Sequence, residues 1–431
     1  MKIRVEDLEN ISKQPIELFY DGIKAQETRE KYTRVLRRVL CEMLEDVLHG
    51  TFEERAAEFV NKSKGNPDLA LSILLAISKK LRERTKLPET DDNYLNPNTI
   101  RNFFKPIKKL FEMNGVAVAW SRVEATFPEL NNKSKGRGYE RNEIESGLEY
   151  ANGAIDRAIM LTAASSGIRE GAFSLNWENL QPVYRVDNKL VFDITESQVE
   201  KAEIVCAILT IYFGTESEGP AFITPEAYYA IMNYRSTWIR EVGREPKPTE
   251  PIFKQEGDFP IMLKPTAIKS RIERIFREAG LRTPLPKGKR RHEIPAMNGF
   301  RRFFDKISKG TVSRDSPLAA LIKKEYMMGH TGLVKTDRNY YQAHIFELVE
   351  EYLEMVPHLT INSKERERME KEKALQQNQE LQDQKMIQKD VMRDLEEMKL
   401  AQQAHSVAAA EKERFLLEKI ASLEEKINKK S

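Results

Sequence analysis

The sequence predicts a mainly helical α+β protein that ends in a long helix. Three observations lead to that class. Apolar residues repeat with a helical period through residues 28–113, two Val- and Ile-rich runs lie between residues 190 and 212, and residues 364–431 contain neither Pro nor Gly. With 431 residues, the chain is long enough for two or three domains.

The first region, residues 1–127, is expected to form an all-α domain. Helical periods run through residues 28–48, 56–60 and 69–81, and the clearest one spans Thr99–Met113. Its apolar face consists of Ile100, Phe103, Phe104, Ile107, Leu110 and Phe111. Pro106 lies inside this stretch, so we expect the helix to kink or to split in two.

Three lysines of the same stretch, Lys105, Lys108 and Lys109, lie largely off the apolar face. They fit either an ordinary solvated helix face or a helix that contacts DNA phosphates. The pattern by itself favours the solvated face.

Residues 128–139 have the composition of a flexible basic linker. The segment contains Pro128 and two glycines, and its basic residues are Lys133, Lys135 and Arg137.

The second region, residues 140–362, mixes helices and strands. A helix over residues 157–164 ends at Ser165-Ser166-Gly167, and strands are expected at 190–194 and 204–212. Further helices are expected at 225–238, at 269–279 and after Pro295.

The tail, residues 363–431, is rich in helix-forming residues, with 15 basic and 15 acidic side chains from Lys364 onward. One apolar column at seven-residue spacing contains Leu381, Leu395, Ala409, Leu416 and Leu423, with Gln388 and Gln402 between them. A second column begins at Val391 and Met398 and drifts to Ile420 and Ile427. The tail is either a solvated single helix or partly disordered segment, or a coiled coil that joins protomers, and we favour the coiled coil because a sustained apolar seam needs a partner.

Composition excludes several classes of protein. The 70 basic and 67 acidic residues give a net charge of only +3, unlike a histone-like chain, and two cysteines cannot form a disulfide framework. The sequence has no phosphate-binding G-x-x-x-x-G-K-[ST] loop and no dense Cys/His or carboxylate cluster, so we expect neither a cofactor nor a metal. It also has no membrane-length apolar run and no signal-peptide pattern at its start, so we expect a cytoplasmic protein.

Four short stretches carry residues capable of chemistry. They are SSGIREGAFSL (165–175), KGKRRHEIPAMNGFRRFF (287–304), MMGH ending at His330, and the pair Tyr340-Tyr341. Each has an ordinary structural explanation when taken alone, such as a surface salt bridge, a solvated loop or core packing. The order Arg, Arg, Gly-His, Tyr is much more specific than any one stretch.

In that order, the four stretches resemble the tyrosine recombinase (integrase) family, with closest similarity to its archaeal integrase-like members. The likeness also includes AFITPEA (221–227), an EYL ten residues after the Tyr pair, and NTIRNFFKPIKKLFEMNGV (98–116), which looks like part of the family's helical core-binding domain. It covers roughly residues 25–359 and does not include the tail.

The resemblance implies a clamp around double-stranded DNA, with a helical core-binding domain and a mixed α/β catalytic domain. A Tyr hydroxyl would attack the scissile phosphate and form a 3′-phosphotyrosine, with a free 5′-hydroxyl as leaving group. Two guanidiniums would neutralise the charge of the transition state without a metal.

The resemblance also implies residue roles. Arg169 and Arg301 match the two family arginines, His330 matches the His after Gly, and either Tyr341 or Tyr340 matches the nucleophile. Asn298 stands where many members have a His, three residues before the second arginine. The family's general-acid lysine has no clear counterpart, and Lys201, then Lys189, are the candidates.

Two functions follow as hypotheses. The first is a site-specific recombinase that works as a DNA-associated homo-oligomer, a dimer or tetramer. The second is an integrase-derived protein that binds and bridges DNA but is catalytically impaired, which Asn298 and the unassigned lysine suggest. In both, the expected DNA contacts are Lys105, Lys108, Lys109, Lys133, Lys135, Arg137, Lys287, Lys289, Arg290 and Arg291.

Overall fold

The structure is a computed structural model that describes residues 14–130, 136–286, 291–313, 315–329 and 344–428. The chain divides into two compact units, residues 1–136 with 283–293, and residues 137–282 with 294–431. Each unit has a hydrophobic core of its own.

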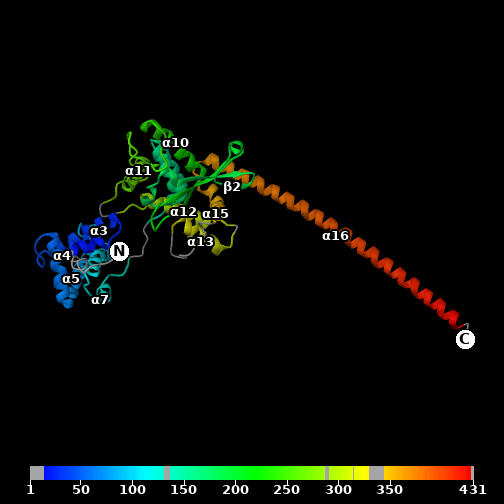
Figure 1. The fold of residues 1–431 in the computed structure, drawn as a ribbon, viewed down its shortest axis with the longest axis horizontal. Helices are drawn as coiled ribbons and strands as arrows, with labels where there is room; N and C mark the ends of the chain where they lie inside the picture. The colour runs from blue at the N-terminus through cyan, green and yellow to red at the C-terminus, as the bar shows by residue number, and fades with distance from the viewer. Residues whose placement is uncertain (1–13, 131–135, 287–290, 314, 330–343, 429–431) are drawn as a thin grey trace, which may run out of the picture. The chain divides into compact units, whose positions relative to one another are not determined.

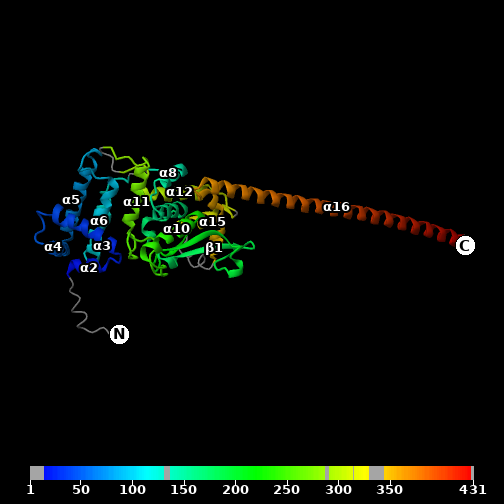
Figure 2. The ribbon, with the colours of Figure 1, turned by 90° about the horizontal axis from the view of Figure 1, so that it is seen from above.

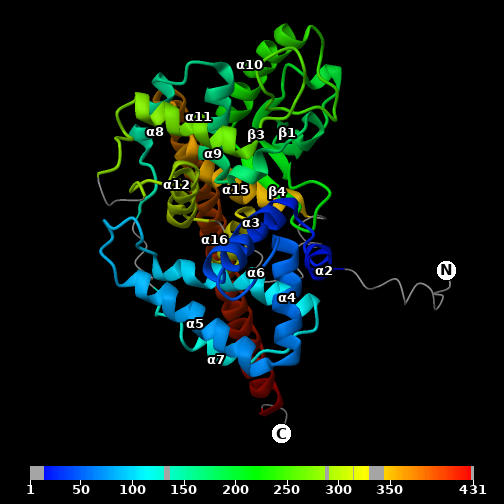
Figure 3. The same ribbon diagram turned by 90° about the vertical axis from the view of Figure 1, so that its left-hand side faces the viewer.

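The first unit is built only of helices in its described residues. They are α2 (Pro15–Asp21), α3 (Gln26–Arg37), a π-helical turn (Arg38–Met43), α4 (Phe52–Gly65), α5 (Pro67–Thr85), a 3₁₀ turn (Pro97–Thr99), α6 (Ile100–Met113) and α7 (Trp120–Glu124). Figure 3 shows α4, α5 and α6 packed within this unit. The helix expected over residues 28–48 is shorter than predicted. Helix α3 ends at Arg37, and the π-helical turn at Arg38–Met43 follows it.

Helix α6 carries the predicted apolar stripe. Every residue of the stripe is buried, as is Pro106, and the helix continues through the proline without a break. The expected split at Pro106 is therefore wrong. The stripe packs against α2, α3 and α5, and this packing stabilises the helix across the lost backbone hydrogen bond.

The second unit contains a four-stranded antiparallel sheet in the order β2-β1-β3-β4. The strands are β1 (Leu180–Val186), β2 (Lys189–Val191), β3 (Glu203–Ile211) and β4 (Gly219–Ile223). Strands β2 and β3 lie where strands were expected, although β2 is shorter. Strands β1 and β4 were not predicted, because Pro182 and Pro220 make their sequences poor strand candidates.

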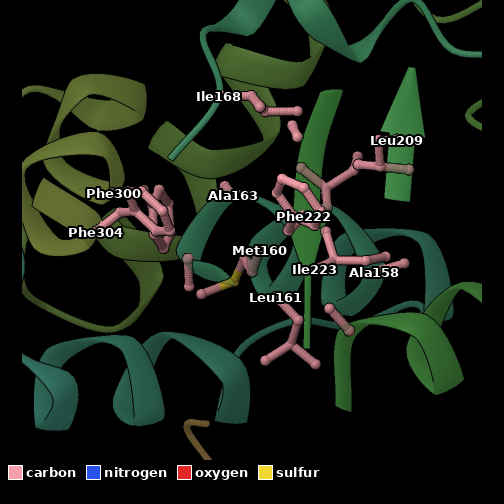
Figure 4. Packing of buried hydrophobic residues seen from close by; sticks show 14 of the residues in the cluster. Ala158, Met160, Leu161, Ala163, Ile168, Leu209, Phe222, Ile223, Phe300 and Phe304 are labelled. Atoms are coloured by element: carbon pink, nitrogen blue, oxygen red, sulfur yellow. The ribbon is translucent and has the colours of Figure 1, made fainter. Parts of the chain in front are cut away.

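Seven helices of the second unit surround this sheet in the described residues. They are α8 (Arg141–Glu149), α9 (Ala154–Ser166), α10 (Pro225–Val242), α11 (Pro265–Glu278), α12 (Ala296–Gly310), α13 (Pro317–Met327) and α15 (Ile345–Leu359). Helix α9 is central, since all its residues from Ala158 to Ser166 are buried. Figure 4 shows Met160 and Ala163 of α9 in one cluster with Phe222 of β4 and Phe304 of α12.

Tyr139 belongs to the core of the second unit, although the sequence placed it at the end of a flexible linker. It is 3% exposed and stacks on Phe276 with ring centroids 4.2 Å apart. Its backbone N–H also donates to the carbonyl oxygen of Gly299 at 3.2 Å. The basic, glycine-rich composition around it gave no sign that this one aromatic ring is buried.

The tail forms one continuous helix, α16 (Ser363–Asn428), drawn from orange to red in Figures 1 and 2. Its start is anchored in the second unit, because the Glu226 carboxylate accepts the backbone N–H groups of Ile361 and Asn362 at 2.8 and 3.0 Å. Met369 packs against the core, and beyond it the described side chains of α16 are exposed. None of the described helices is both long and apolar enough to cross a membrane.

Candidate active site

The site is built around the C-terminal end of α9. Gly167 ends this helix in the left-handed conformation, at φ 60°. A Cβ at this position would also lie 2.8 Å from Cβ of Phe304, so only glycine fits both the backbone and the contact with α12. The turn leads through buried Ile168 to Arg169, which is exposed and precedes a 3₁₀ turn at Glu170–Phe173.

Arg301 joins two helix ends from its place on α12. Its Nη1 donates to the carbonyl oxygen of Gly167 at 2.9 Å, and its Nη2 donates to that of Met328 at 2.6 Å. These two carbonyls lie at the C-terminal ends of α9 and α13. The last carbonyls of a helix have no hydrogen-bond partner within the helix, and the helix dipole favours a positive charge beside them. The guanidinium is therefore held in one orientation by the carbonyls at two helix ends.

The two arginines lie close enough to influence each other. Burial, and next the positive charge of Arg169, lower the pKa of Arg301 from its ordinary value, while Tyr212, Asp305 and Glu325 act in the opposite direction. An anion at this point would offset the repulsion between the two guanidiniums. The pair therefore has the electrostatics of a phosphate site.

The chain on both sides of residues 330–343 is fixed to the same end of α9. Before that segment, Met328 accepts from Arg301, and Gly329 follows at φ 65°. After it, Tyr352 of α15 is fully buried and donates its hydroxyl to the carbonyl oxygen of Ser165 at 2.8 Å. His330, Tyr340 and Tyr341 themselves lie outside the described residues.

Tyr212 is a further candidate for the site, which the sequence analysis missed. It follows β3 at φ 54°, a left-handed conformation that is uncommon for an aromatic residue. Its ring lies beside Gly171, and its hydroxyl is close enough to Arg301 to raise the pKa of that guanidinium. Backbone strain of this kind clusters at functional positions. The sequence around Tyr212 contains no pattern that predicts the left-handed conformation.

Asn298 lies one helical turn before Arg301, exposed on α12. The helix face beside it is fixed by Gly299, where a Cβ would be only 2.5 Å from Cε2 of Tyr139. This packing leaves the Asn298 amide directed away from the core, where it can donate a hydrogen bond to a bound group.

The two candidate lysines stand in different connections. Lys189 is exposed at the first position of β2, directly after a tight turn in which Asp187 and Asn188 both have positive φ. Lys201 is exposed two residues before β3, in the longer connection between β2 and β3.

The expected DNA contacts differ in their surroundings. Lys105 and Arg291 are exposed. Lys108 pairs with Glu124 at 3.6 Å and lies 5.5 Å from the Trp120 ring centroid, and Lys109 pairs with Glu112 at 3.7 Å. Arg137 makes two bonds to the Glu143 carboxylate, at 2.7 and 2.6 Å.

Five of the expected DNA contacts, Lys133, Lys135, Lys287, Lys289 and Arg290, fall outside the described residues. Over the part of the chain that is described, no group of three or more His, Cys, Asp or Glu side chains could hold a metal ion.

Comparisons with solved structures return site-specific recombinases. The XerA recombinase is 12% identical at a TM-score of 0.30, over 73% of this chain and 98% of that one. The lambda integrase (75–356) dimer bound to a core site is 14% identical at 0.39, over 76% and 92%. The XerH recombinase bound to its difH substrate is 15% identical at 0.39, over 78% and 93%.

No protein-family model matches the sequence, and no curated protein matches it. Because the structural likenesses have TM-scores below 0.5, they carry no argument about function. The functional assignment therefore depends on the geometry around Arg301 and on the order of the sequence motifs.

Proposed function

We propose that this chain is a site-specific DNA recombinase that cuts and rejoins double-stranded DNA through a 3′-phosphotyrosine. The observation that carries the proposal is the guanidinium of Arg301, fixed by the carbonyls of Gly167 and Met328 and placed beside Arg169. A fixed guanidinium with a second positive charge nearby suits a phosphodiester whose negative charge grows during attack.

In the proposed reaction, the hydroxyl of Tyr341 or Tyr340 releases its proton to solvent, its oxygen attacks the scissile phosphorus, and the bond to the 5′-oxygen breaks. The departing 5′-oxygen takes a proton from a lysine, for which Lys201 and Lys189 are the candidates. The covalent link conserves the phosphodiester, so the 5′-hydroxyl of a second strand can attack it and release the tyrosine. Arg169, Arg301 and His330 would hold the non-bridging oxygens, and Asn298 would donate a further hydrogen bond.

The anchoring of the chain on both sides of residues 330–343 supports this assignment. Arg301 fixes the residue that precedes Gly329 and His330, and Tyr352 fixes α15, which follows the tyrosine pair. The Tyr352 bond ends on Ser165, four residues before Arg169, and the second bond of Arg301 ends on Gly167, two residues before Arg169. The described chain on either side of residues 330–343 is thus held near the end of α9 that precedes Arg169.

Asn298 favours a second candidate function. An amide cannot exchange a proton at neutral pH, so a protein with Asn at this position can bind DNA and yet cleave it slowly or not at all. In that case the chain would be a DNA-binding and bridging protein of integrase descent.

A covalent trap tests the proposal. Full-length protein is incubated with a pool of nicked duplexes, quenched in denaturant and examined for DNA attached to protein, while binding to the same pool is measured separately. Tyr340→Phe and Tyr341→Phe are the test variants, and Tyr229→Phe, an exposed tyrosine on α10, is the matched control.

We expect attached DNA in the native and control proteins and none in one of the two test variants. If the protein binds duplexes that include its own target sequence and attaches to none, the bridging function replaces the recombinase.

A further inference from the structure

We infer that α16 pairs with the α16 of a second copy of this chain as a parallel, in-register coiled coil. Helix α16 exposes an apolar face that nothing in the described structure covers beyond Met369. The exposed fractions of Leu381, Val391, Leu395 and Leu416 are 50%, 52%, 43% and 51%. A 66-residue helix with such a face needs a partner helix to bury it.

The seam between the helices follows from the heptad columns. Leu381, Gln388, Leu395 and Gln402 occupy one seam position, a, and Val391 and Met398 occupy the other, d. Further along, Leu416 and Leu423 continue the first column, with Ile420 between them. Between Met398 and Ile420 the second apolar column departs from strict seven-residue spacing. Such a shift changes the winding of a coiled coil locally.

Polar residues in the seam determine the register. In a parallel, in-register pair, Gln388 faces Gln388 and Gln402 faces Gln402 of the second copy. Each amide can then both donate and accept a hydrogen bond across the seam. A shift by one heptad would instead place Gln388 against Leu395, leaving its amide without a partner in an apolar seam.

Charges beside the seam favour the parallel direction. In a parallel pair, a residue at the flanking g position faces the e position five residues further along the second copy. Asp394 then faces Lys399, and Ile387 faces Met392. In an antiparallel pair, e positions meet e positions, so Lys385 and Lys399 would lie together and repel each other.

The direction has a structural consequence. A parallel coil joins the two copies at the same end, next to the anchor of α16 at Glu226. An antiparallel coil would hold the two anchors apart by the length of the helix, on the order of 100 Å at 1.5 Å per residue. This pairing does not depend on the proposed chemistry, because it involves neither DNA nor the arginine site.

Cysteine cross-linking in the full-length protein tests the inference. In Leu395→Cys the new thiol would face its own copy across the seam, whereas in the matched control Glu397→Cys it would point away from the seam. The unsubstituted protein provides the background, since Cys41 is only partly exposed and Cys206 is buried. Sedimentation of the full chain and of a chain ending at Ile361 gives the oligomeric state.

We expect a dimer that is lost on truncation, and a disulfide-linked dimer in Leu395→Cys but not in Glu397→Cys. Asp394→Lys should weaken dimerisation several-fold, and adding Lys399→Asp should restore it. A monomeric full chain, or equal cross-linking of the two cysteine variants, would overturn the inference. So would linkage between Leu381→Cys and His405→Cys chains when neither links to itself, because an a position faces a d position only in an antiparallel pair.

Discussion

At the scale of single residues, Arg301 has two roles that involve the same atoms. Its guanidinium satisfies two helix-end carbonyls and at the same time places a positive charge beside Arg169. A lysine would keep the charge but could not make both bonds in one plane. The two bonds therefore require arginine at this position, and under the proposed function the same guanidinium would bind the phosphate.

Asn298 gives the first prediction. Asn298→His would place a group that can exchange protons at neutral pH one turn before Arg301. General acid–base catalysis contributes about 10²–10⁴-fold, so we expect the cleavage rate to rise by roughly tenfold or more. The rate is measured on a duplex that the native protein cuts, with Asn298→Gln as the control that keeps the amide. An unchanged rate would show that other groups already supply this proton transfer.

Tyr212 gives the second prediction. Tyr212→Phe removes only the hydroxyl beside Arg301 and keeps the ring against Gly171. Because this hydroxyl lies near the guanidinium, its removal changes the electrostatic surroundings of Arg301, so we expect cleavage to slow several-fold while the free energy of unfolding and the DNA affinity stay unchanged. Single-turnover cleavage is compared with that of Tyr229→Phe, and equal rates would remove Tyr212 from the site.

The third prediction concerns the leaving-group proton. Replacement of the true donor, Lys201 or Lys189, by Ala should slow cleavage by about 10²-fold or more. A substrate whose 5′-bridging oxygen is replaced by sulfur should restore the rate of that variant, because a thiolate leaves without a proton. The other lysine variant serves as the control. If neither variant shows this rescue, the donor lies elsewhere.

At the scale of elements, the end of α9 depends on Gly167. The helix has to stop where its last carbonyls meet Tyr352 and Arg301, and the turn that follows has to pass against Phe304. A left-handed residue without a side chain satisfies both conditions.

Gly167→Ala is therefore the fourth prediction. The left-handed backbone costs an alanine about 1–2 kcal/mol, and the contact with Phe304 adds about 1–3 kcal/mol of overpacking. Gly280→Ala isolates the first cost, because Gly280 has φ 73° and nothing lies within 4 Å of its added Cβ. Urea denaturation should show a clearly larger loss at Gly167, and similar losses would mean that Phe304 moves aside freely.

At the scale of the whole molecule, binding should reflect basic side chains spread over both units. Each phosphate contact releases a counterion, so the logarithm of the binding constant should fall linearly with the logarithm of salt concentration. This is the fifth prediction. Lys105→Ala should reduce the magnitude of that slope by about 1, whereas Lys80→Ala on α5 should leave it unchanged. A flat salt dependence in the native protein would contradict DNA binding through these residues.

The sequence alone determined the features that depend on neighbouring residues. The stripe of α6, the strands β2 and β3 and the unbroken helix of the tail all follow from periods of two or 3.6 residues, which are local properties of the chain. The motif residues Arg169, Asn298 and Arg301 could be named in the same way, because the order of short motifs is also visible in the sequence.

Only the tertiary structure decided how these pieces act together. The partners of Arg301 lie 134 and 27 residues away in the chain, and Tyr212 lies near Arg301 after a left-handed turn that no period predicts. Strand β1 forms despite Pro182 because β3 pairs with it along Leu180–Arg185, whereas β2 pairs only with Tyr184–Val186, beyond the proline. Tyr139 is buried because its ring stacks on Phe276 and its N–H donates to Gly299. Contacts of this kind depend on long-range packing, which overrides local preference wherever distant segments meet.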